Sequence, residues 1–278
     1  MEQRNLILAF ALSTVIIIAW IAYQTIFMPP RPVPPPTAQT QTEAPATTGS
    51  QAPSAVPAPG MTTGASAVVV VDRETALTQS PRVAIDSPSI KGSIALKGGR
   101  IDDVVLVKYR ETIDPNSPNI VLFSPANAPH AYYAEFGWSA AGGDVKLPDA
   151  ATVWQADADK LTPEKPLTLT WDNGQGLKFV RVFTLDKDYL FTVTQRVENS
   201  GASPVMLYPY GRVLRVGKPK TLGFFILHEG FLGVFNGTLA EDKYDTVSEA
   251  PDGVIHYDST GGWLGITDKY WLAAVAPA

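Results

Sequence analysis

The sequence has 278 residues, with 22 basic and 27 acidic side chains and a formal net charge of −5. A mildly acidic chain without a basic stripe argues against nucleic acid as a partner, and against an anionic lipid surface as the main partner. It contains no cysteine, which excludes disulfides and thiol chemistry and is compatible with an exported location.

Residues 6–28 form a run of 23 residues without charge, proline or glycine. At roughly 1.5 Å per residue, a helix of this length reaches about 34 Å, enough to cross a bilayer core of ~30 Å. We predict an uncleaved transmembrane signal anchor over residues 1–28. The positions that we assign to the anchor include Leu6, Phe10, Ile17, Trp20, Tyr23 and Met28.

The alternative for this segment is a cleaved signal peptide, which needs a shorter apolar stretch followed by small residues. Here the run ends in the bulky residues Ile26, Phe27 and Met28, and paired prolines follow. Arg4 and the terminal amine favour an N-terminus in the cytoplasm. The remainder of the chain would then be exported.

Residues 29–66 predict a disordered, proline-rich linker. Ten prolines occur between positions 29 and 64, where no residue is aromatic and only Arg31 and Glu43 are charged. Such a segment has too little apolar surface to fold, and its prolines favour extended polyproline II. A proline-motif ligand at residues 32–35 is the competing interpretation, but the surrounding Ala, Thr and Gln residues are typical of a spacer.

Residues 67–278 predict a mainly β domain. Leu167, Leu169 and Trp171 alternate with polar side chains, the dipeptide at 173–174 is Asn-Gly, and the period of two resumes after it. Many short strands without a long amphipathic helix indicate an antiparallel sandwich. The candidate strands are residues 101–109, 120–123, 132–138, 167–171, 177–185, 189–197, 205–216, 231–235 and 263–266.

The domain offers little catalytic chemistry. His228 and Glu229 begin the H-E-x-x-H zinc pattern, but no second histidine completes it, and neither a nucleophile elbow nor a phosphate-binding loop occurs. Asp102 and Asp103 look like a carboxylate pair, but neighbours on a strand point to opposite faces, so we expect that they cannot share a substrate. The sequon at residues 236–238 is better explained as an Asn-Gly turn. We expect no catalytic residue, metal or cofactor, and a structural role for His228 rather than acid or base work; the other histidines are His130 and His256.

Two stretches are more distinctive. Residues 217–230 contain Gly-Lys-Pro and His-Glu-Gly, and residues 261–272 contain Gly-Gly-Trp followed by Asp-Lys-Tyr-Trp. Together they closely resemble the large periplasmic domain of the YidC-type bacterial membrane protein insertases of Gram-negative cells, and the entry into the anchor at residues 3–6 and the proline-rich linker match that family too. The motif positions, to which we assign no definite role, are Gly217, Lys218, Pro219, His228, Glu229, Gly230, Gly262, Trp263, Asp268, Lys269, Tyr270 and Trp271.

The resemblance implies a fold, a function and a location. The fold would be an antiparallel β-supersandwich of the mutarotase-like type. The function would be insertion, folding and assembly of inner-membrane proteins, with or without the Sec translocon. The implied partners are inner-membrane protein substrates, the Sec translocon with its SecD and SecF accessory proteins, and the lipid bilayer. The location would be the inner membrane of a Gram-negative cell, with the main domain in the periplasm.

The chain departs from this family in one respect. The family builds a polar groove from five further transmembrane helices, and no second apolar run of spanning length follows residue 28. We therefore expect a fragment whose sandwich is incomplete at Ala278, and which cannot replace an insertase by itself. Two other classes stay open for the domain: a carbohydrate-binding or mutarotase-like domain, for which fold alone is weak support, and a structural spacer.

Overall fold

The computed structural model describes residues 69–142, 144–219, 227–268 and 270–278. The predicted anchor, with its six assigned positions, the predicted linker and Lys269 lie outside the described residues. Within the described ranges, no helix has both the length and the apolar character that a membrane crossing requires. All described residues belong to one compact unit, Ala55–Ala278.

The first sheet has seven strands, paired in the order β11-β5-β3-β2-β1-β7, with β4 joined to β3. Neighbouring strands are antiparallel except β1 and β7, which run parallel. The strands are β1 (Arg82–Asp86), β2 (Ile90–Ala95), β3 (Arg100–Arg110), β4 (Asn119–Phe123), β5 (Tyr132–Ala140), β7 (Lys160–Leu161) and β11 (Leu207–Arg215).

The second sheet has four antiparallel strands in the order β10-β9-β8-β6. They are β6 (Gln155–Ala156), β8 (Leu167–Asp172), β9 (Leu177–Leu185) and β10 (Phe191–Asn199). The predicted turn between β8 and β9 is confirmed: the Asn173 side-chain oxygen accepts hydrogen bonds from the backbone N–H groups of Gln175 (2.7 Å) and Leu177 (3.0 Å). Gly174 supplies the positive φ of 72° that this turn requires.

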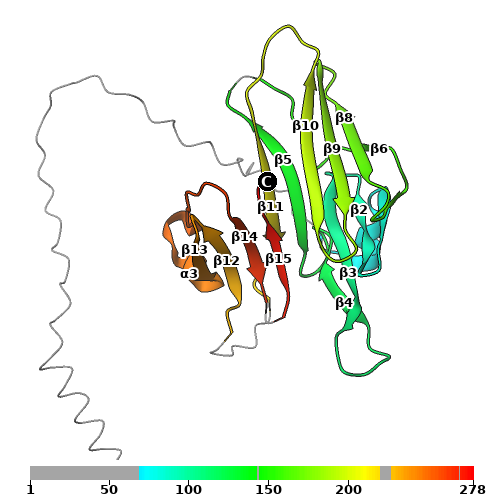
Figure 1. Cartoon of the computed structure of the whole chain (residues 1–278), viewed down its shortest axis with the longest axis vertical. Helices are drawn as coiled ribbons and strands as arrows, with labels where there is room; N and C mark the ends of the chain where they lie inside the picture. The colour runs from blue at the N-terminus through cyan, green and yellow to red at the C-terminus, as the bar shows by residue number, and fades with distance from the viewer. Residues whose placement is uncertain (1–68, 143, 220–226, 269) are drawn as a thin grey trace, which may run out of the picture. The chain divides into compact units, whose positions relative to one another are not determined.

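The third sheet is also antiparallel, in the order β13-β12-β14-β15. Figure 1 shows it beside β11 of the first sheet. Three short helical segments complete the described structure. The remaining elements are β12 (Gly230–Phe235), β13 (Thr238–Lys243), β14 (Trp263–Thr267), β15 (Leu272–Val275), the helices α2 (Arg73–Thr78) and α3 (Tyr244–Glu249), and the 3₁₀ turn η1 (Pro251–Gly253).

The core lies between the first and second sheets. Trp138 of β5 meets Phe179 of β9 edge-on at 5.1 Å between ring centroids, and stacks with Trp154 at 6.4 Å. Alternate residues of β8 and β9 are buried in this layer, as the sequence predicted, although Val180 between two of them is buried too. The structure confirms the mainly β, antiparallel, sandwich-like fold. Other fully buried core residues are Val83, Ile94, Leu161, Leu167, Leu169 and Phe183.

Candidate functional site

The later of the two distinctive motifs lies where the third sheet meets the first. Arg215, at the end of β11, donates from Nη1 to both carboxylate oxygens of Asp268, at 2.8 and 2.9 Å. Its guanidinium carbon lies 4.7 Å from the centroid of the Tyr132 ring, and the Tyr132 hydroxyl donates to the carbonyl of Ile266 at 3.0 Å. Burial alone would lower the pKa of Arg215, but the Asp268 carboxylate outweighs it and the pKa is raised. These contacts of Arg215 and Tyr132 with Asp268 and Ile266 join the first sheet to the third, and we call them the joint between the two sheets.

Several other motif residues also have structural contacts. Lys218 bridges to both oxygens of Asp245 at 2.8 Å, on the surface. His228 Nε2 lies 2.8 Å from the carbonyl oxygen of Phe231, so this histidine has the backbone partner that a structural role requires. A Cβ on Gly262, at φ +99°, would lie 2.0 Å from the carbonyl oxygen of Val234. Only glycine fits there, because the two backbones approach too closely for a side chain.

The remaining described motif residues are spread over the third sheet and its turns. Gly230 begins β12, where a Cβ would lie 2.5 Å from the carbonyl oxygen of Asp242. Trp263 begins β14 and is half-buried, Tyr270 is exposed, and Trp271 packs edge-on against Tyr109 at 5.0 Å. The structure thus associates most motif residues with the third sheet. Of the other described motif positions, Gly217 is exposed, whereas Pro219 and Glu229 are half-buried.

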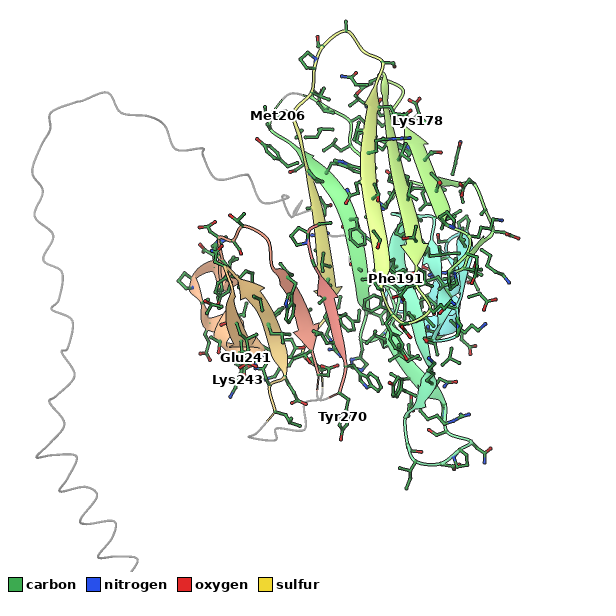
Figure 2. The ribbon with its side chains drawn as sticks, viewed as in Figure 1. Lys178, Phe191, Met206, Glu241, Lys243 and Tyr270 are labelled. Carbon is green, nitrogen blue, oxygen red and sulfur yellow. The ribbon has the colours of Figure 1, made fainter. Side chains whose placement is uncertain are left out.

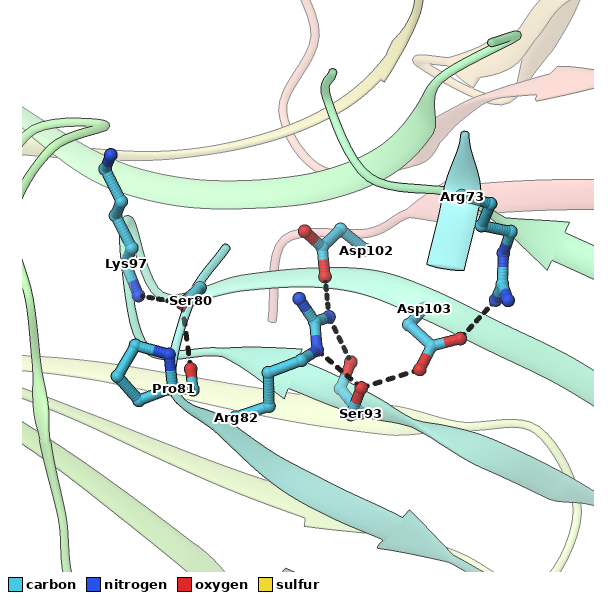
Figure 3. A network of polar contacts seen from close by, with 8 residues as sticks. All are labelled: Arg73, Ser80, Pro81, Arg82, Ser93, Lys97, Asp102 and Asp103. Atoms are coloured by element: carbon cyan, nitrogen blue, oxygen red, sulfur yellow. Dashed lines mark hydrogen bonds and ion pairs between the residues drawn. The ribbon is translucent and has the colours of Figure 1, made fainter. Parts of the chain in front are cut away.

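A second polar cluster surrounds Asp102 and Asp103 (Figure 3). Arg82 of β1 pairs with Asp102 and donates from Nε to the Ser93 hydroxyl at 2.7 Å. That hydroxyl donates to Asp103 at 2.6 Å, and Arg73 of α2 pairs with the same carboxylate. The two aspartates therefore belong to one connected network.

The expectation that these aspartates point to opposite faces was wrong, and the reason is a β-bulge. Ser93 pairs with Asp103, whereas the next residue, Ile94, pairs with Ile101, so Asp102 has no partner on β2. An extra residue in one strand breaks the alternation of side chains. Burial raises the pKa of Asp102, although the nearby Arg82 acts in the opposite direction.

The same network fixes the short helix α2 to the middle of the first sheet. Asp72 caps the helix by accepting a hydrogen bond from the backbone N–H of Thr75 at 2.9 Å. The backbone N–H of Val71 donates to the carbonyl of Asn127 at 3.0 Å. Together with the pair of Arg73 and Asp103, these contacts fix where the chain enters the domain.

A third charged group, Arg181, lies inside the core and is only 1% exposed. It donates to the carbonyl oxygens of Gly99 at 2.8 Å and Phe136 at 2.5 Å, and its guanidinium carbon lies 4.6 Å from the centroid of Trp154. Burial lowers its pKa to about 10, which leaves it charged at neutral pH. The alternation along β9 does not by itself single out Arg181. Its signal was a charged residue at an inward position.

Two hollows lie near Arg181, one beside Arg181 itself and one beside Trp138, whose ring its guanidinium contacts. One, of about 360 Å³, lies between β5, β10 and β11; the other, beside Arg181, measures about 30 Å³. The smaller holds no more than a water-sized molecule, and the larger has mostly apolar walls, so neither resembles a sugar site, which needs several convergent polar groups. The larger hollow is lined by Trp138, Val197, Asn199, Pro204, Val205, Leu207 and Pro209. Among the described residues, no group of three or more possible metal ligands comes together.

These features define a mainly β, sandwich-like domain whose buried charges join its sheets and its first helix. Residues 82–278 match the family model described as the YidC periplasmic domain. Proteins named "Membrane protein insertase YidC" are similar over nearly the whole chain: that of Methylorubrum extorquens is 48% identical over 99% of this chain, and that of Bradyrhizobium diazoefficiens 46% identical over 99%. A relative from Methylobacterium nodulans is 53% identical over 80% of the chain.

The chain belongs to the YidC family of membrane protein insertases, and residues 82–278 belong to its periplasmic domain. The resemblance inferred from the two motifs is confirmed. The chain spans about half the length of the curated relatives it matches, 47% of the Methylorubrum protein and 46% of the Bradyrhizobium protein.

Proposed function

We propose that this chain is the membrane anchor and periplasmic interaction domain of an insertase that inserts, folds and assembles inner-membrane proteins. The observation that carries the proposal is the family match over residues 82–278. The buried charged residues Asp102, Asp103 and Arg181 support it, because each is already engaged with another group of the domain. A non-enzymatic role in contacting other proteins suits such a domain.

The proposed organisation has three parts: an anchor at residues 1–28, a flexible linker at residues 29–66 and the periplasmic domain at residues 67–278. The N-terminus would lie in the cytoplasm of a Gram-negative cell. Protease added to spheroplasts should then digest the domain and leave a membrane-embedded stub. A mature protein that begins near Pro30 would contradict the anchor.

The proposed partners are inner-membrane proteins during insertion and the Sec translocon with SecD and SecF. The apolar hollow between β10 and β11 supports contact with hydrophobic segments, since its walls include Trp138, Val197 and Leu207. A photo-crosslinker in place of Met206, whose neighbours Val205 and Leu207 line that hollow, should capture newly made inner-membrane proteins. The matched position is Glu241, exposed on β13 of the third sheet, where we expect little capture.

Depletion of the protein in its own bacterium tests the function directly. Single-span inner-membrane proteins should accumulate in an uninserted, protease-accessible form, while a cleaved periplasmic protein continues to be exported. Normal insertion after depletion would contradict the insertase function. Capture that is equal at Met206 and Glu241 would contradict the proposed role of the hollow without touching the family assignment.

A further inference from the structure

Aromatic and apolar side chains from three separate segments gather beside the base of the β3–β4 hairpin. We call Tyr109, Tyr189, Leu190 and Trp271 the aromatic tip. Tyr109 lies near the end of β3, Tyr189 and Leu190 lie between β9 and β10, and Trp271 precedes β15. The Tyr109 ring centroid is 5.0 Å from that of Trp271 and 6.5 Å from that of Tyr189.

The aromatic tip is exposed, although the Tyr109 ring contacts the rings of Tyr189 and Trp271. Tyr109 is 45% exposed, Tyr189 41% and Leu190 64%, whereas Trp271 is half-buried. In Figure 2, Phe191, which follows Leu190, and Tyr270, which precedes Trp271, lie below Lys178 and Met206, and the β3–β4 hairpin extends beyond them. Contiguous exposed apolar surface can mark a binding surface.

The connection that carries Tyr189 and Leu190 is firmly held. The Asp186 carboxylate accepts hydrogen bonds from the backbone N–H groups of Asp188 at 2.8 Å and Leu190 at 3.0 Å. The Ser89 hydroxyl donates to the carbonyl of Lys187 at 2.8 Å. A surface that is already ordered loses little conformational entropy when it binds.

We propose that the aromatic tip docks into the interfacial layer of the bilayer that holds the anchor, an inference that rests on the anchor proposed above. Tyrosine and tryptophan rings with an apolar body and a polar edge favour this layer, and leucine adds apolar burial. The sequence also brings the bilayer within reach, because a flexible chain as long as residues 29–66 spans about 30–40 Å on average. Tethering keeps the effective concentration of the surface high, so a small apolar patch is sufficient.

Charge around the tip favours apolar docking over electrostatic attraction. The basic side chains next to it are balanced by acidic ones, so neither an anionic surface nor low salt should strengthen docking. This agrees with the mildly acidic composition of the chain. The basic residues are Lys108, Arg110 and Lys187, and the acidic ones are Glu111, Asp186 and Asp188.

Because the chain has no cysteine, a single nitroxide label can report the depth of one position. The full chain would be reconstituted into phosphatidylcholine vesicles as Leu190→Cys or, as the matched control, Met206→Cys; Met206 is 66% exposed and lies above Phe191 in Figure 2. We expect the ratio of oxygen to nickel-chelate accessibility at position 190 to exceed that at position 206 several-fold, and to persist at high salt. Equal, water-like ratios at both positions would overturn the proposal.

A second pair of variants tests the tip itself. Tyr109→Ser with Tyr189→Ser should lower the ratio at position 190, whereas Leu239→Ser, an exposed apolar position on β13, should not; both should keep the wild-type melting temperature. An unchanged ratio in the double variant would overturn the proposal. So would a label that stays in water with lipid alone and becomes protected only when other proteins are added. Failure of the protein to float with the vesicles would instead refute the anchor, and docking with it.

Discussion

Replacing Arg181 should separate the effect of its charge from that of its volume. Arg181→Ala removes a side chain that is 1% exposed and contacts Trp154 and Trp138, and it leaves the carbonyls of Gly99 and Phe136 without their donor. Truncating a large buried side chain costs roughly 2–5 kcal/mol, and each orphaned buried group adds about 1 kcal/mol or more. We expect Arg181→Ala to cost about 4–5 kcal/mol of unfolding free energy.

Arg181→Met keeps most of the volume and also removes the cost of holding a cation in the core. Replacing a buried ion by an apolar side chain of similar size is often nearly neutral, so the two lost hydrogen bonds should dominate, at about 1–2 kcal/mol. The difference of about 3 kcal/mol between the variants corresponds to roughly 6–12 °C in melting temperature for a domain of this size.

Thermal unfolding of the full chain in detergent, followed by near-ultraviolet circular dichroism, measures both variants. The neighbouring Trp138 and Trp154 make this signal sensitive to the environment of Arg181. An Arg181→Met variant as unstable as Arg181→Ala would show that the cation itself is needed. That result would refute the reasoning from volume.

Three further predictions concern the other buried groups. Burial raises the pKa of Asp102 above 3.8, so the folded state holds this proton more tightly than the unfolded state does, and wild-type stability falls as the pH rises from 3.8 through the folded-state pKa. Asp102→Asn should therefore gain stability relative to wild type over this pH range. A loss of stability relative to wild type over the same range would contradict the direction of the pKa shift. Gly262→Ala should lower the free energy of unfolding by at least 2 kcal/mol, about the strain of an unfavourable φ plus a backbone clash. Gly261→Ala, at φ +79° with open space around it, should lower it by about 1 kcal/mol. Equal urea midpoints for the two variants would refute the clash at Gly262. Arg215→Met should leave Asp268 without its partner and speed amide hydrogen exchange in β14 and β15 more than in β8 and β9, and a uniform increase would contradict the assignment of this pair as a joint.

The sequence predicted the strands whose two faces have different surroundings. In β8 and β9 one face is buried and the other is more exposed except at Val180, so the alternation is visible. β1 and β2 were missed, and in β2 the apolar pattern is interrupted at Gly92 and Ser93. The two-residue strands β6 and β7 depend on pairing alone, and no local pattern could reveal them.

The charged groups were harder to predict than the strands. The bulge that joins Asp102 to the network of Asp103 depends on the register between β2 and β3, which alternation cannot specify. The partners of Arg181 are carbonyls of residues far away in sequence, Gly99 and Phe136, so its role depends on the tertiary fold. The motif around Asp268 indicated the family, but its ion pair with Arg215 appeared only in the structure.

The attachment of α2 has a mechanical consequence. Any pull along the chain from its N-terminal side reaches the domain at Val71 and Arg73, whose contacts lead to Asn127 and to Asp103 of β3. β3 is an interior strand flanked by β2, β4 and β5, so the load enters the middle of a sheet and is shared by several strands. A load applied to an edge strand would break one ladder a bond at a time. The domain can therefore bear tension applied from its N-terminal side without being unravelled from its first residue.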